Sequence, residues 1–88
     1  MRKILKYDLD LLQPTTIELP LGAIIRTVQF QSKIPRVWVE LDPEVTRTQP
    51  HTFTLVSTWD WVYDVGEYLT SILTKDEKYL RHVYHQIN

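Results

Sequence analysis

Hydrophobic and polar residues alternate along most of this chain, which is the pattern of half-buried β-strands. Residues 5–11 show it first, with an apolar side chain at every second position and polar or charged side chains between them. Similar runs follow, and prolines, which cannot donate to a strand ladder, fall between them. These runs cover residues 15–19, 24–31, 36–41 and 51–58. The pattern therefore predicts a protein built from short strands.

The run over residues 24–31 contains one exception to the alternation. Ile24, Val28 and Phe30 share the apolar face with Arg26, the single charge on that face. A polar stretch with a proline at each end follows the next strand and extends to Pro50, and it predicts a loop.

The last third of the chain is compatible with two structures. Apolar side chains recur at helical spacing over residues 75–87, where Thr74 and Glu77 form a capping box. Residues 67–73 and 79–85 are equally two strand-forming runs separated by a polar loop. Eight Val, seven Ile and ten Thr among 88 residues, against one Ala, favour strands.

Chain length and composition bound the architecture. Eighty-eight residues bury one modest core, so residues 1–88 are predicted to form a single domain. The fold class that we expect is mostly β: a small sandwich or half-open barrel of about six or seven short antiparallel strands. Such a fold leaves an edge strand to be paired or covered, and homo-oligomerisation is a simple way to cover it.

The chain carries no targeting or disulfide signal. It has no cysteine, which excludes a disulfide framework and a thiolate metal site. Lys6, Asp8 and Asp10 interrupt the apolar start that a secretory signal would need, and no run approaches the roughly 20 apolar residues of a membrane helix. We therefore expect a cytoplasmic protein without membrane contact.

The sequence lacks the usual motifs of catalytic, metal and cofactor sites. No serine lies in a nucleophile elbow, and two isolated glycines cannot form a phosphate loop. A metal site would need His51, His82 and His85 to converge with a carboxylate, but in a strand His82 and His85 point to opposite faces. We expect no enzymatic activity, no metal and no cofactor.

Charge gives a second, weaker candidate site. Ten Lys and Arg are balanced by eleven Asp and Glu and form no run, so nucleic acid is not an expected partner. The fold could still gather Arg26, Arg36 and Arg81 near Trp38 into a patch for phosphates. The alternative function is therefore a small-ligand binder, such as a nucleotide-sequestering anti-defence protein, and a nucleic-acid-binding module is the third.

The strongest candidate site is a short aromatic and acidic segment. It consists of Trp59, Asp60, Trp61, Val62, Tyr63 and Asp64. Tryptophan and tyrosine are enriched in interface hot spots, and the carboxylates add hydrogen-bond acceptors. The competing interpretation is that Trp61 and Val62 fill the core. Protein binding would use five of these residues: Trp59, Asp60, Trp61, Tyr63 and Asp64.

Several short motifs occur in a recognisable order along the chain. They are Lys6-Tyr7, Thr16-Ile17-Glu18-Leu19-Pro20-x-Gly22-Ala23-x-Ile25, Val28-Gln29-x-Gln31, Val37-Trp38-Val39-Glu40-Leu41-Asp42-Pro43, Tyr68-Leu69 and His82-Val83-Tyr84. Together they resemble a family of short, uncharacterised proteins encoded by bacteriophages and prophages. The resemblance implies strands in the last third and implies no activity.

The resemblance and the aromatic segment together suggest a function. Family members tend to have a plain Thr-Gly-His-like loop where this chain has Thr58-Trp59-Asp60-Trp61. We expect a non-enzymatic phage accessory protein that binds a host or defence protein in the bacterial cytoplasm and inhibits or modulates it.

Overall fold

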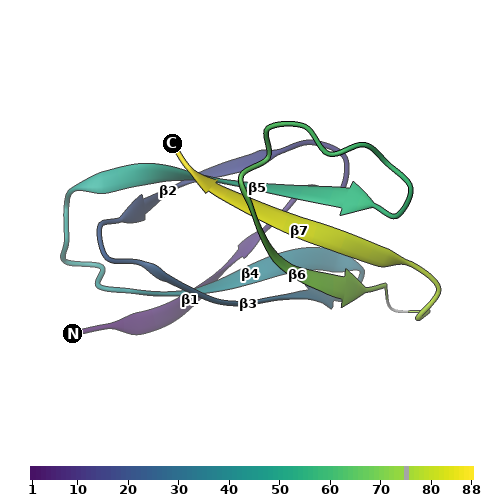
Figure 1. Cartoon of the computed structure of the whole chain (residues 1–88). Helices are drawn as coiled ribbons and strands as arrows, with labels where there is room; N and C mark the ends of the chain where they lie inside the picture. Colours follow the sequence, from purple (N-terminus) through teal and green to yellow (C-terminus); the bar gives the residue numbers. More distant parts are fainter. Residues whose placement is uncertain (75) are drawn as a thin grey trace.

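The computed structural model describes residues 1–74 and 76–88, and over these residues the chain forms seven strands and no helix (Figure 1). The strands are β1 (Lys3–Asp8), β2 (Thr15–Pro20), β3 (Ile24–Gln31), β4 (Ile34–Leu41), β5 (Thr48–Ser57), β6 (Glu67–Leu73) and β7 (Leu80–Ile87). The described part of the chain accordingly has no apolar helix of membrane-spanning length. The prediction of a mostly β fold is confirmed.

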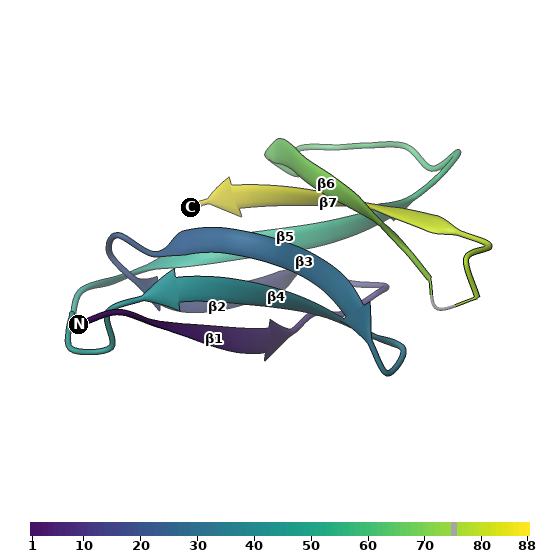
Figure 2. The ribbon, with the colours of Figure 1, turned by 90° about the horizontal axis from the view of Figure 1, so that it is seen from below.

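The strands form two sheets that lie one over the other (Figure 2). One sheet has three strands in the order β1-β4-β3, and the other has four in the order β2-β5-β7-β6. All neighbouring strands are antiparallel. The edge strands β3 and β6 approach each other without joining the sheets into one. The architecture is thus a small sandwich.

One connection in the four-stranded sheet crosses a neighbouring strand. β5 and β6 both pair antiparallel with β7, from its two sides, so they run parallel to each other. Residues 58–66 must therefore carry the chain across β7, and they do so on the side of this sheet that faces away from the other sheet (Figures 1 and 2). We call residues 58–66 the crossover segment.

The core lies between the sheets and is built by side chains that alternate inward. The side chains with the least exposure are Phe53, Leu19, Val37, Val39 and Val83. In β4 every second residue is buried, because successive side chains of a strand point to opposite faces. The opposite face of β4 carries Arg36, Trp38 and Glu40, so this strand supplies both core and surface.

The predicted face of β3 is wrong at its start. The register of β3 against β4 shifts between Ile25 and Thr27, which is the mark of a β-bulge at Arg26. Ile25 therefore packs on the core, whereas Ile24 is 41% exposed. The bulge removes Arg26 from the apolar face, and the guanidinium reaches Glu40 instead.

The last third of the chain is a hairpin. β6 and β7 pair directly, so the helical alternative for residues 75–87 is wrong for the described residues. Lys75, the first residue of that range, lies outside the described residues. The polar loop predicted to reach Pro50 is shorter than expected, because β5 already begins at Thr48 and pairs there with Pro20.

Candidate protein-binding surface

The aromatic side chains of the crossover segment point into solvent. Trp59 is 97% exposed, Trp61 81% and Tyr63 73%. Val62 is also exposed, so the interpretation that Trp61 and Val62 fill the core is wrong. Asp60 and Asp64 lie on the same segment and are exposed as well. The structure therefore keeps all five residues of the predicted site together on one surface segment.

The backbone at Trp59 adopts a conformation that bulky residues avoid. Its φ is 80°, in the left-handed region where a β-carbon clashes with the backbone. The turn is closed by a hydrogen bond from the amide N of Asp60 to the carbonyl O of Ser57, at 3.0 Å. Because Trp59 buries almost no surface, packing within the chain does not offset this strain.

The start of the crossover segment is fixed to the sheet by a chain of side-chain hydrogen bonds. Thr58 Oγ1 lies 2.9 Å from His82 Nε2, and His82 Nδ1 lies 2.8 Å from Ser71 Oγ. Tyr68 OH extends the chain to Ser71 Oγ at 2.8 Å. The bonds link the residue before Trp59 to both strands of the final hairpin.

Sequence reasoning did not find this hydrogen-bonded chain. Ser71 and His82 are eleven positions apart, and they meet because they lie directly opposite in the β6–β7 register. A hairpin centred on the predicted loop, residues 74–78, would have paired Ser71 with Arg81, whereas the observed register pairs Ser71 with His82. Both ring nitrogens of His82 are within hydrogen-bond distance of a hydroxyl group, so this histidine has a structural role here.

The end of the crossover segment is fixed by a glycine. Gly66 has a φ of 88°, and a β-carbon at this position would overlap the carbonyl oxygen of His85. Only glycine can take this conformation and approach the neighbouring backbone so closely. Both ends of the segment are therefore held on β7, at His82 and at His85.

Two other histidines, His51 and His85, form a pair beneath this anchor, on the core side of the sheet. His51 Nδ1 lies 2.8 Å from His85 Nε2, and Phe53 stacks on the His85 ring with 4.9 Å between ring centroids. Burial lowers the pKa of His51, and burial together with the neighbouring His51 lowers the pKa of His85. Both rings are therefore harder to protonate than an exposed histidine.

The histidines do not converge into a metal centre. His82 and His85 point to opposite faces of β7, as predicted for a strand. Among residues 1–74 and 76–88, no three His, Asp or Glu side chains gather closely enough to hold an ion.

The second predicted site is only partly assembled. Arg26, Arg36 and Trp38 share the outer face of the three-stranded sheet, whereas Arg81 lies in β7 of the other sheet, with its guanidinium 6.0 Å from the centre of the Tyr79 ring. Both arginines of the first group already have carboxylate partners. The ion pairs are Arg26–Glu40 at 2.8 Å and Arg36–Asp8 at 2.7 Å.

Glu40 is the centre of the charged network on this face. Its carboxylate also accepts a hydrogen bond from Arg2 Nε at 3.0 Å. The hydrogen bonds from Arg26 and Arg2 hold the pKa of Glu40 below its ordinary value. A phosphate at this face would therefore have to compete with a carboxylate that is ionised and already bound.

Comparison with known proteins gives a family without a known activity. The chain matches the family DUF7352, which is described as a domain of unknown function, over residues 1–88. No curated protein and no solved structure matches the chain.

Proposed function

The chain belongs to the family DUF7352, a domain of unknown function, and from its own surface we propose that it is a non-enzymatic protein-binding domain. The crossover segment is the surface that contacts the partner. Trp59, Trp61 and Tyr63 are the apolar anchors, and Asp60 and Asp64 accept hydrogen bonds from the partner.

The observation that carries the proposal is that Trp59 is both exposed and held in a strained backbone conformation. A tryptophan that is 97% exposed contributes little burial to the stability of the fold, and its φ of 80° strains the backbone. Burial of such a ring against a partner removes about 150–250 Å² from water, which is the kind of contribution that hot spots make. Strained backbone of this kind is concentrated at functional sites.

The anchoring of the segment supports the same proposal. Binding loses affinity when a loop has to be ordered at the moment of contact, and a loop that is held in advance avoids that cost. Thr58 is hydrogen-bonded to His82, and Gly66 packs on the backbone of His85. Both ends of the segment are therefore already fixed in the unbound protein.

We propose a partner from the resemblance to bacteriophage and prophage proteins. The partner is a protein of the bacterial host, such as a defence protein, which the segment occludes in the bacterial cytoplasm. Exposed edge strands such as β1 and β2 are the proposed route to homo-oligomers, because they leave unpaired ladder groups at the sheet edges.

Capture from bacterial lysate with a tagged protein tests the proposal. We expect the wild type to retain a partner that the double variant Trp59→Ala/Trp61→Ala loses. The partner is then purified, and calorimetry should show its affinity for the double variant reduced by at least about tenfold. The matched control is Leu12→Ala, since Leu12 is 88% exposed in a different loop. Equal capture by the wild type and the double variant, or no capture by either, contradicts the proposal.

The small-ligand alternative has weaker support. A nucleotide at Arg26, Arg36 and Trp38 would have to displace Glu40 and Asp8, and Arg81 lies on the other sheet. The same separation weakens a nucleic-acid-binding role. A rise in melting temperature with any of a panel of nucleotides would favour nucleotide binding over protein binding, because a ligand that binds only the folded state stabilises it.

A further inference from the structure

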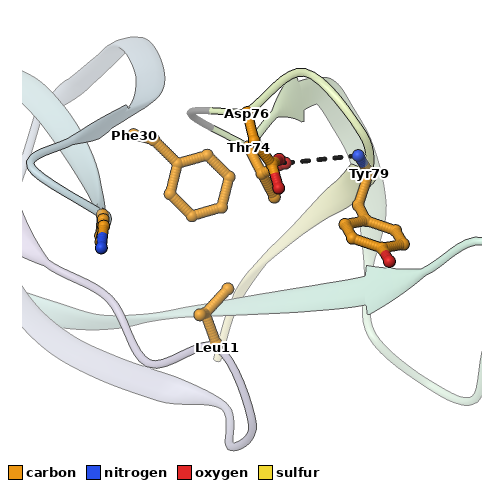
Figure 3. Close-up of a pocket in the computed structure, with 6 residues that line it drawn as sticks. Leu11, Phe30, Thr74, Asp76 and Tyr79 are labelled. Atoms are coloured by element: carbon orange, nitrogen blue, oxygen red, sulfur yellow. Dashed lines mark hydrogen bonds between the residues drawn. The ribbon is translucent and has the colours of Figure 1, made fainter.

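A cavity of about 520 Å³ opens at one end of the sandwich (Figure 3). One of its lining residues, Tyr79, also lines a neighbouring hollow together with Trp59 of the crossover segment. Three connections form the walls of the cavity: the one between β1 and β2, the β3–β4 turn and the β6–β7 loop. The residues that line it are Leu11, Phe30, Lys33, Thr74, Asp76 and Tyr79. Its volume lies within the range of about 300–1,000 Å³ that small-molecule sites occupy.

The walls of the cavity are mainly apolar. Phe30 and Leu11 point into the space between the loops, and Tyr79 lies across from Phe30 (Figure 3). Leu11 and Tyr79 are both exposed, so their apolar surface faces the opening rather than the core. The cavity can therefore shelter an apolar group about the size of a ring or a short alkyl chain.

Among the residues that the structure describes, two charged side chains line the cavity, and they differ in what they already bind. The Asp76 carboxylate accepts hydrogen bonds from the Thr74 hydroxyl and from the backbone N of Lys78, which lower its pKa. Lys33, by contrast, has no ion pair or side-chain hydrogen bond with any described residue. The ammonium is thus the group that can take up a ligand.

The backbone at Lys33 adds an independent observation. Ser32 and Lys33 form the two-residue β3–β4 turn with φ of 51° and 68°. Turns of this type favour Asn and Gly at both positions, since other residues pay a steric cost there. A lysine at such a position, beside an apolar cavity, indicates a use for its side chain.

We infer that this cavity binds a small amphipathic anion, with its apolar body against Phe30, Leu11 and Tyr79 and its carboxylate or similar head group on Lys33. The site adjoins the start of the crossover segment through Tyr79, but none of its lining residues belongs to that segment, and the inference does not depend on the proposed protein partner. Charge decides the ligand class, since a cationic head group would have to use Asp76, whose carboxylate is engaged within its own loop.

The sign of the ligand's charge can be tested with three probes of equal chain length. Octanoate, 1-octanol and octyltrimethylammonium are titrated into ¹⁵N-labelled protein and followed by amide chemical shifts. We expect octanoate to bind about fivefold more tightly than octanol, as an exposed ion pair contributes up to about 1 kcal/mol. The shifts should concentrate at Leu11, Phe30, Lys33 and Tyr79. Equal affinities, tighter binding of the ammonium, shifts elsewhere or no saturable shifts would overturn the inference.

Matched variants locate the charge. Lys33→Gln should remove the preference for octanoate over octanol, and Lys33→Arg should retain it. Lys78→Gln is the control, because Lys78 belongs to the same β6–β7 loop and does not line this cavity. Loss of the preference in Lys78→Gln, or its survival in Lys33→Gln, would assign the anion to another site.

Discussion

Two regions of the molecule combine tryptophan with charged residues and use them in opposite ways. On the outer face of the three-stranded sheet, Trp38 is half-buried between Arg36 and Glu40, which both have partners of opposite charge. In the crossover segment, Trp59 and Trp61 stand in solvent. The two regions have similar composition and differ in whether neighbouring strands surround them.

The difference identifies which surface is free for a partner. Trp38 lies opposite Lys6 of β1 and Thr27 of β3, so side chains from both sides cover it. Within residues 1–74 and 76–88, the crossover segment has no ladder neighbours, and its ends are held at Thr58 and Gly66. Neighbouring strands therefore cover Trp38 within the fold, whereas the aromatic side chains of the crossover segment remain exposed and available to a partner.

The anchor at Gly66 gives the largest expected effect. Gly66→Ala forces a β-carbon against the His85 backbone in a left-handed conformation, and we expect a loss of about 2–4 kcal/mol of unfolding free energy. Urea denaturation followed by circular dichroism measures it.

Gly22→Ala is the control for this variant. Gly22 has nearly the same φ, 86°, but nothing lies within 4 Å of the position that its β-carbon would take. We expect only the conformational cost, about 1 kcal/mol. Similar losses in the two variants would show that the crossover segment is not fixed by close packing at its end.

The sequence was sufficient for most of the strands and insufficient for the crossover. Alternation depends only on neighbours along the chain, so it predicted runs such as β4, in which every second residue is buried. It misplaced Ile24 because the bulge at Arg26 shifts the pattern by one residue. The Thr58–His82–Ser71 chain and the exposure of Trp59 depend on which strands become neighbours, and one-dimensional periodicity does not contain that information.

Truncation of the two tryptophans compares the regions directly. Trp38→Ala should cost about 1–3 kcal/mol, less than for a fully buried ring, because the half-buried indole packs on its neighbours. Trp59→Ala should change the unfolding free energy by no more than about 0.5 kcal/mol, as expected for a surface position. A loss of more than about 1 kcal/mol in Trp59→Ala would show that the ring packs within the fold.

Acid should weaken the two sheets in different pH ranges. Both His51 and His85 have a pKa below the ordinary value of 6.5, although Glu18 and Glu67 act in the opposite direction. The unfolded chain therefore binds more protons below pH 6.5, and the stability from this pair is complete above that pH and falls as the pH is lowered.

Glu40 responds at lower pH. Its pKa lies below 4.5 in the folded chain, so its contribution is present above that pH and is lost only as the pH falls through the lowered pKa. Amide protection, which is the intrinsic exchange rate at each pH divided by the observed rate, should fall between pH 7 and pH 5 in β5 and β7 before it falls in β4. A uniform fall in protection would show that the histidine pair does not set the acid response.

Substitution of Trp59 by glycine separates backbone strain from side-chain contact at this position. Glycine takes a φ of 80° without the clash that alanine and tryptophan suffer, a relief of about 1–2 kcal/mol. The greater freedom of glycine in the unfolded chain offsets about 0.4–1 kcal/mol of this. Trp59→Gly should therefore be more stable than Trp59→Ala by about 0.5–1 kcal/mol. Neither variant should bind the partner, because both lack the indole. If glycine gives no gain over alanine, the left-handed turn carries no strain, and the exposure of Trp59 alone has to support its role in binding.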